Sequence, residues 1–255
     1  MGILRRLRSD GMLSHMESQG SNSCPSVDTV PGLPPDRDVF VGHHSKVWQA
    51  LSRREVPVGR MPVAIGHRDV ATWAFTESDL VWVLSYSRVP AENSRLLEQL
   101  RQAGARRVIY VTSSSTIVGT ITSCYEYPRV KRRAELEALA MLAAKVLTIG
   151  MLYDDPAQLP CGANVATSYD ELAAFVATPQ WPDEGGRRKH LIHIVHRPFG
   201  RPVERWAYVQ YGRLLQWAGT RPCIMRPLDV LLRALGARWY GYVYLSNSLW
   251  NSTIS

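Results

Sequence analysis

Several absences narrow what this 255-residue sequence can encode. No apolar run approaches the roughly 20 residues that a membrane-spanning helix needs. The first residues include arginines but no apolar core of the signal-peptide type, so secretion is not expected. The cysteines at positions 24, 124, 161 and 223 lack the paired spacing of a zinc or redox motif, which predicts free thiols in a reducing compartment. We therefore expect a cytoplasmic protein without a metal site.

A nucleic-acid-binding signature is also absent, although the formal net charge of +8 favours an anionic partner. The basic residues are dispersed in short groups, such as Arg53-Arg54 and Arg187-Arg188-Lys189, and do not form one stripe. No helix-turn-helix, zinc-finger or RNA-recognition pattern accompanies them. We therefore expect no nucleic acid partner, which leaves nucleotide phosphates or an acidic lipid surface as the anionic candidates.

Residue 38 marks the start of a regular alternation of β-prone and helix-prone segments. The β-prone runs are 38–42, 62–66, 80–84, 108–111 and 146–152, and the helix-prone segments are 45–53, 91–104 and 128–145. This alternation predicts an α/β fold with a Rossmann-like, doubly wound parallel sheet. The β-prone runs are continuously apolar, which is typical of strands that are covered on both faces.

The two ends of the chain differ from this alternating part. Residues 1–37 are rich in Ser, Gly, Pro and Asp without periodicity, which predicts a disordered N-terminal tail. Residues 38–156 are assigned to the domain core, and 157–255 to a smaller substrate-side region packed on the same domain. The expected elements of that region are helices at 169–177, 206–217 and 225–235, a polar loop at 179–188, and strands at 190–196 and 239–245.

Tyr127 and Lys131 point most directly to chemistry. A β-prone run leads into Ser113 and Ser114, and Pro128 then fits the first turn of a helix, where its missing N–H costs nothing. Residues four apart share a helix face, and an ammonium close to a phenol lowers the pKa of the phenol toward neutrality. A serine hydroxyl opposite can hold a carbonyl or alcohol oxygen. Together these groups predict a proton-transfer site for alcohol–carbonyl chemistry.

The alternative is that Tyr127 is simply a packed amphipathic side chain, since Tyr-x-x-x-Lys often occurs by chance. Its position after a strand and a hydroxyl cluster favours the catalytic interpretation. The ends of the expected strands agree, because Gly42, Gly66, Ser85 and Ser113 all fall there. Ligands of doubly wound sheets bind beyond the carboxyl ends of the strands, so these residues predict a nucleotide-type site.

These residues resemble the short-chain dehydrogenase/reductase superfamily, especially its extended branch of NAD-dependent sugar epimerases, dehydratases and reductases. The similarity covers about residues 38–156. Residues 104–114 resemble the strand before that branch's catalytic serine, and Tyr127 to Lys131 matches its Tyr-x-x-x-Lys. The resemblance implies that Tyr127 is the acid/base, and that Lys131 lowers its pKa and holds the nicotinamide ribose.

The same resemblance implies a serine that orients the substrate oxygen, with a nicotinamide cofactor that carries the hydride chemistry. Counting forward from the strand selects Ser113, and counting back from Gly119 selects Ser114. Both serines therefore remain candidates.

The first turn departs from the three-glycine phosphate loop of that superfamily. It has the sequence Gly42-His43-His44-Ser45-Lys46-Val47-Trp48, so only the first glycine is kept and Trp48 stands near the place of the last. His67 and Arg68, not an acidic residue, follow the second strand, and this implies NADP over NAD because an arginine accommodates the 2′-phosphate. A solvated Arg68 paired with Asp69 is an equal alternative. The cofactor-binding candidates are Gly42, His43, His44, Ser45, His67, Arg68 and Ser85.

Two other groups of residues have ordinary explanations beside functional ones. On the predicted strand His193 faces away from His190 and His196, which lie about 20 Å apart at roughly 3.3 Å per residue, so one ion cannot bind them. The aromatic residues of 237–255 suit a membrane–water interface, and they suit a packed subdomain or dimer seam at least as well. Peripheral membrane contact is therefore one hypothesis only.

Two functional hypotheses follow. The first is an NAD(P)-dependent oxidoreductase, epimerase or dehydratase that acts on a sugar or sugar-nucleotide-like substrate, in polysaccharide biosynthesis. The second is a catalytically degenerate Rossmann-fold protein that binds nucleotide weakly or not at all and acts as a sensor or scaffold. The altered glycine turn separates the two. The resemblance also implies a homodimer through the helix that follows Tyr127.

Overall fold

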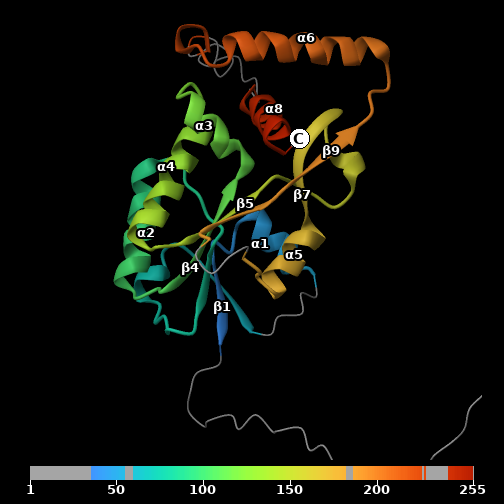
Figure 1. The fold of residues 1–255 in the computed structure, drawn as a ribbon. Coiled ribbons are helices and arrows are strands. Elements are labelled where there is room, and N and C mark those ends of the chain that lie inside the picture. Colours follow the sequence, from blue (N-terminus) through green and yellow to red (C-terminus); the bar gives the residue numbers. More distant parts are fainter. Residues whose placement is uncertain (1–35, 55–59, 182–185, 226, 228–240, 255) are drawn as a thin grey trace, which may run out of the picture. The chain divides into compact units, whose positions relative to one another are not determined.

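The main sheet is parallel and has the strand order β2-β1-β3-β4-β5-β8 (Figure 1). The structure is a computed structural model, and it describes residues 36–54, 60–181, 186–225, 227 and 241–254. The strands are β1 (Arg37–Val41), β2 (Met61–Ile65), β3 (Leu80–Val83), β4 (Arg107–Ser113), β5 (Lys145–Ile149) and β8 (Arg188–Leu191). The predicted Rossmann-like parallel sheet is therefore confirmed. The predicted tail, 1–37, falls almost entirely outside the described residues.

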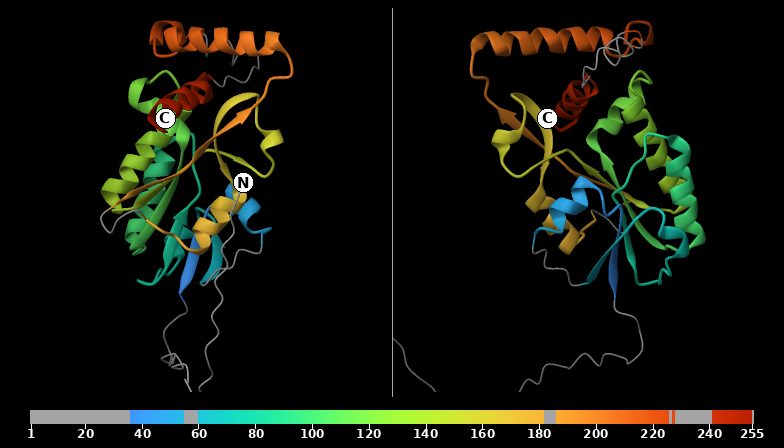
Figure 2. Two further views of the ribbon diagram at one scale, coloured as in Figure 1. Left: turned by 45° about the vertical axis from the view of Figure 1, so that its right-hand side comes forward. Right: turned by 180° about the vertical axis from the view of Figure 1, so that it is seen from behind.

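Helices cover both faces of this sheet (Figures 1 and 2). On one face, α2 (Pro90–Gln102) and α4 (Glu126–Met141) bury Leu97, Leu100 and Ala138 against the strands. On the other face, α1 (Lys46–Leu51) and α5 (Tyr169–Ala177) bury Leu51 and Leu172. Strands β1, β3, β4 and β5 are therefore buried on both faces, which explains why their sequence runs are continuously apolar. Between β2 and β3 the chain forms only the short 3-10 helix η1 (Val70–Thr72).

A second, three-stranded sheet was not predicted. It contains β6 (Met151–Tyr153), β7 (Gly162–Ser168) and β9 (His193–Arg197), with β7 parallel to β6 and antiparallel to β9. Two predictions are corrected here, because the runs 146–152 and 190–196 are each divided between the two sheets. The first division falls at Gly150, where a Cβ atom would lie 2.6 Å from the Ala166 Cα atom, so only glycine permits this approach of β7.

The C-terminal region contains two further described helices, α6 (Pro202–Ala218) and α8 (Gly241–Ile254). The helix predicted at 206–217 is confirmed, whereas most of 225–235 lies outside the described residues. The strand predicted at 239–245 is wrong for its described part, since residues 241–245 begin α8. Leu245 is buried against Leu215 of α6 and Val118, so tertiary packing outweighs the β-propensity of the aromatic residues.

No helix among the described residues has the length and apolar character that crossing a bilayer requires. Cys124, Cys161 and Cys223 are free thiols, as the sequence predicts, and Cys24 lies outside the described residues.

Candidate active site

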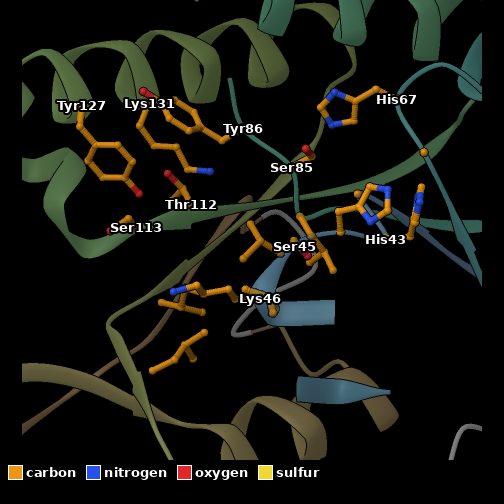
Figure 3. Close-up of a pocket in the computed structure, with 18 of the residues that line it drawn as sticks. His43, Ser45, Lys46, His67, Ser85, Tyr86, Thr112, Ser113, Tyr127 and Lys131 are labelled. Carbon is orange, nitrogen blue, oxygen red and sulfur yellow. The ribbon is translucent and has the colours of Figure 1, made fainter. Parts of the chain in front are cut away.

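A cleft of about 1260 Å³ opens at the carboxyl ends of β1 to β5 (Figure 3). Eleven residues were predicted as site residues from the sequence, and ten of them line this cleft. They are Gly42, His43, His44, Ser45, His67, Arg68, Ser85, Ser113, Tyr127 and Lys131. The cleft is also lined by Lys46, Tyr86, Thr112 and Tyr169, which are not among the eleven. The strand topology thus brings the ten predicted residues together from five separate segments of the chain.

Ser114, the eleventh candidate, does not line the cleft. Ser114 is only 7% exposed, and its backbone carbonyl accepts a hydrogen bond of 2.8 Å from the indole N–H of Trp250. Ser113 precedes the 3-10 helix η2 (Ser114–Ile117), and its side chain faces Tyr127 instead. The geometry therefore favours Ser113 over Ser114 as the hydroxyl that meets a ligand.

The side chains of Tyr127 and Ser113 are hydrogen-bonded to each other. Ser113 Oγ also accepts two hydrogen bonds from Ser115, from the backbone N–H at 3.3 Å and from the hydroxyl at 3.0 Å. A serine hydroxyl has one donor and two acceptor positions, so Ser113 is left to donate to the Tyr127 oxygen. Such a donated bond stabilises the phenolate, and it lowers the pKa of Tyr127.

Burial has the opposite and larger effect, and it raises the pKa of Tyr127 above its ordinary value. The sequence predicts that Lys131 lowers this pKa toward neutrality, and the structure differs on this point. Lys131 Nζ lies 5.1 Å from the ring centroids of both Tyr86 and Tyr110, as a cation over two aromatic faces. The hydroxyl of Ser113, and not the ammonium of Lys131, is the group that favours the phenolate.

Lys131 is only 5% exposed, and burial lowers its pKa to about 8. Glu135, one turn further along α4, raises the pKa of Lys131 and so opposes this shift. The Glu135 carboxylate is itself buried and pairs with Arg132 and Arg188, while the Thr112 hydroxyl donates to it at 3.2 Å. Lys131 is therefore an ammonium that loses its proton easily, a property suited to a proton-transfer site.

The cofactor side of the cleft is built around Gly42. This residue has φ +110°, and a Cβ atom on it would lie 2.7 Å from Ser85 Cβ, so glycine is required at the turn. Trp48, which stands in place of a family glycine, packs on Phe40 with ring centroids 4.7 Å apart and does not line the cleft. The tryptophan at this position therefore does not fill the cleft.

The cations of this side are exposed or only partly buried. Asp69 accepts a 2.9 Å hydrogen bond from the Gly66 N–H, and no ion pair joins Asp69 to Arg68 in the described part of the chain. Of the two alternatives for Arg68, the ion pair with Asp69 is thus not found, and Arg68 lines the cleft. His67 is half-buried, burial lowers its pKa, and its Nε2 atom has no hydrogen-bond partner. A buried nitrogen atom that lines a cleft and has no hydrogen-bond partner in the protein is typical of a ligand-binding position.

Two aromatic residues that close the catalytic end had little or no signal in the sequence. Tyr86 and Tyr242 both contact Tyr127, with ring centroids 5.1 Å and 5.6 Å away. Tyr86 directly follows the strand-end residue Ser85, so the strand-end argument extended by one residue would have found it. Tyr242 comes from α8, more than a hundred residues further along the chain, and no local pattern could indicate it. Within the described residues, no group of three or more His, Cys, Asp or Glu side chains could hold a metal ion.

No protein-family model and no curated protein matches the chain. Similar solved structures include a dTDP-4-dehydrorhamnose reductase from Clostridium acetobutylicum, with 11% identity over 72% of this chain and 81% of that one, at a TM-score of 0.46. A dTDP-4-dehydrorhamnose reductase from Bacillus anthracis in complex with NADP has 8% identity over 74% and 83%, at a TM-score of 0.47.

A short-chain dehydrogenase/reductase superfamily protein from Agrobacterium tumefaciens with bound NAD has 13% identity over 63% of this chain and 79% of that one, at a TM-score of 0.47. All three structures are less than 15% identical to this chain and have TM-scores below 0.5.

Proposed function

We propose that this chain is an NAD(P)-dependent oxidoreductase, epimerase or dehydratase that acts on a sugar-like substrate. The observation that carries the proposal is that Tyr127, Ser113 and Lys131 line one cleft at the carboxyl ends of the strands, with Tyr127 and Lys131 on the same helix. A phenol whose oxygen accepts from one hydroxyl and lies near a second titratable group can exchange a proton with a substrate oxygen.

The cleft has features that fit a dinucleotide. Gly42 lets the turn after β1 pack closely on Ser85, and the unpartnered His67 Nε2 offers a polar contact. Because α1 is only six residues long, we assign phosphate binding to side chains, chiefly Lys46, Arg68 and His43. Arg68, in the turn that follows β2, favours NADP over NAD because an arginine accommodates the 2′-phosphate.

A bound nicotinamide cofactor would supply hydride transfer. On reduction, the Tyr127 phenol donates its proton to the substrate oxygen as a C–H bond forms at the carbonyl carbon. On oxidation the same oxygen takes the proton back. Ser113 donates to the Tyr127 oxygen in the free site, and it orients the substrate oxygen when a substrate is present. The Lys131 ammonium adds positive charge to the cleft, where it stabilises negative charge that develops on the substrate oxygen.

The sugar-like substrate is inferred from the chemistry of the lining. Tyr86 and Tyr169 present aromatic surface, and Thr112 and Ser113 present hydroxyl groups that can bond to a polyhydroxylated ring. The cations Lys46 and Arg68 also suit a substrate that carries phosphate. These properties agree with a keto-sugar linked to a nucleotide, as in the synthesis of polysaccharides.

Fluorescence titration with NADPH and NADH tests the proposal. We expect micromolar binding of NADPH that Gly42→Val abolishes, because φ +110° and the 2.7 Å contact to Ser85 exclude a side chain. Ser114→Ala, outside the cleft, is the matched control and keeps the affinity. With a panel of nucleotide-linked keto-sugars, Tyr127→Phe should abolish turnover and leave cofactor affinity nearly intact. Failure to bind either cofactor at millimolar concentration would contradict the proposal.

The second candidate is a Rossmann-fold binding protein without catalysis. The raised pKa of Tyr127 and the loss of two of the three loop glycines favour it. It acts as a sensor or scaffold, and it predicts weak or no cofactor binding, no turnover on any keto-sugar, and a Tyr127→Phe variant that behaves like the original chain.

A further inference from the structure

Helix α6 carries an apolar stripe that faces away from the rest of the protein. Val203, Trp206, Leu214 and Trp217 are 63%, 65%, 56% and 56% exposed. Their spacing of three, eight and three residues keeps them on one side of a helix, over about 21 Å at 1.5 Å per residue. Exposed tryptophan and leucine side chains in a contiguous row mark an interaction surface more often than isolated exposed residues do.

The opposite side of α6 is already used for packing within the protein. Leu215 and Ala218 are 2% and 4% exposed and belong to a cluster with Leu245 of α8. Gly212 lies directly under the Tyr244 hydroxyl, which leaves no room for a side chain there. Figures 1 and 2 show α6 lying across α8. The exposed stripe is therefore a second face of the helix, separate from its core contacts.

The charges around the stripe are predominantly positive. Arg201, Arg205, Arg213 and Arg221 are all exposed, and Glu204 is the only acidic residue between positions 201 and 225. The Arg221 guanidinium lies 4.4 Å from the ring centroid of Trp217, so a cation and an aromatic ring share the end of the stripe. A helix with apolar aromatics on one side and flanking arginines matches the composition of helices that bind anionic lipid interfaces.

We propose that α6 binds peripherally to an anionic membrane surface, with Trp206 and Trp217 inserted at the headgroup level. A second copy of the chain fits less well, because two α6 faces brought together would oppose their arginines, whereas an anionic surface neutralises them. No residue of α6 lines the cleft, so the proposed surface is independent of the candidate active site. Membrane binding through α6 brings the cleft close to substrates that are attached to a membrane.

This surface replaces the one suggested by the sequence. The aromatic residues of α8, which the sequence analysis offered as an interface, are engaged inside the protein. Trp250 is 8% exposed and bonded to Ser114, and Tyr242 packs on Tyr127. Those rings cannot reach a bilayer while the fold is intact, whereas the stripe on α6 is free to do so.

Flotation of the full chain with vesicles tests the proposal. We expect binding to vesicles of phosphatidylcholine and phosphatidylglycerol at low salt, and little binding to phosphatidylcholine alone. Replacement of Arg205 and Arg213 by Gln should weaken binding to the anionic vesicles by about 30-fold and flatten its salt dependence, because each arginine near such a surface contributes about 1 kcal/mol. Trp206→Ser with Trp217→Ser should weaken it by about 10-fold or more at any salt.

Leu136→Ser is the matched control, since Leu136 is an equally exposed apolar residue, 48%, on α4. It should leave vesicle binding unchanged, and NADPH affinity should be the same in all these variants. Equal binding to neutral and anionic vesicles, or none to either, would overturn the proposal. So would a dimer in sedimentation that the Trp206 and Trp217 variant converts to a monomer, because the stripe would then be a seam between two copies.

Discussion

The indole N–H of Trp250 donates a 2.8 Å hydrogen bond to the backbone carbonyl of Ser114, across 136 positions of sequence. The bond fastens the C-terminal helix α8 to the turn that follows β4. That turn also holds Ser113, and Tyr242 of the same helix packs on Tyr127. The last described helix of the chain thus packs against Tyr127 and holds the turn that carries Ser113.

Trp250→Phe should therefore lower the free energy of unfolding by about 1–3 kcal/mol, since it leaves a buried carbonyl without its donor. Thermal and urea unfolding measure this loss. Trp206→Phe is the matched control, because Trp206 is 65% exposed and the change should be within error. If both variants unfold at the same midpoint as the original chain, the bond to Ser114 contributes nothing to stability.

The hydrogen bond from Ser113 makes a second prediction, on the titration of Tyr127. Ser113→Ala removes the donor that favours the phenolate, so the pKa of Tyr127 should rise further. The difference in tyrosinate absorbance between the chain with Tyr127 and its Tyr127→Phe variant isolates this one phenol. The difference curve should move to higher pH in the Ser113→Ala background and stay in place with Ser114→Ala. An unmoved curve in both would show that Ser113 does not donate to Tyr127.

Much of this site follows from local sequence, for a simple physical reason. Strands β1 to β5 are short apolar runs, and parallel strands meet with their carboxyl ends at one edge, so Gly42, Ser85 and Ser113 had to converge. Tyr127 and Lys131 share one helix, where spacing alone decides that they lie on the same face. Such relationships depend on backbone periodicity and need no knowledge of distant packing.

The parts that the sequence analysis missed depend on contacts between distant segments. The apolar run 146–152 gives no sign that it changes sheets at Gly150, because the cause is the approach of Ala166. The stretch 241–245 has the β-prone aromatics of a strand, and it is helical because Leu245 has to reach Leu215. The pKa of Tyr127 likewise depends on its burial beneath Tyr242, which the spacing from Lys131 to Tyr127 does not encode.

The buried ammonium of Lys131 makes a third prediction, on the pH dependence of stability. Its pKa is about 8 in the folded protein and 10.5 in its ordinary surroundings, so between these values the unfolded chain binds more protons. The free energy of unfolding contributed by this group should therefore rise as the pH increases from 8 to 10. Below pH 8 Lys131 is protonated in both the folded and the unfolded state, so the free-energy cost of burying its charge is fully present.

Lys131→Met removes this titration. The difference in melting temperature between the original chain and this variant should therefore shift in favour of the original chain from pH 8 to pH 10 and stay constant from pH 6 to pH 7. Lys46→Met, at an exposed position of the same cleft, is the matched control. A difference that is constant up to pH 10 would mean that Lys131 is not buried as an ammonium.

Thr167 makes the fourth prediction, because it joins the two points at which the chain leaves the main sheet. Its Oγ1 atom accepts a 2.8 Å hydrogen bond from the Gly150 N–H after β5 and donates to the Leu191 carbonyl at the end of β8. Thr167 is completely buried, so Thr167→Val keeps the shape and leaves both backbone groups without their partner. The loss should be about 2–6 kcal/mol of unfolding free energy, at roughly 1–3 kcal/mol for each of the two unsatisfied groups.

Thr178→Val is the matched control for that change, since the Thr178 hydroxyl bonds only to the Ala174 carbonyl at an exposed helix end. It should alter the urea midpoint by little. Because Gly150 lines the cleft, Thr167→Val should also weaken NADPH binding, whereas Thr178→Val should not. A stable Thr167→Val variant with unchanged affinity would show that the division of the chain between the two sheets is held by the strands alone.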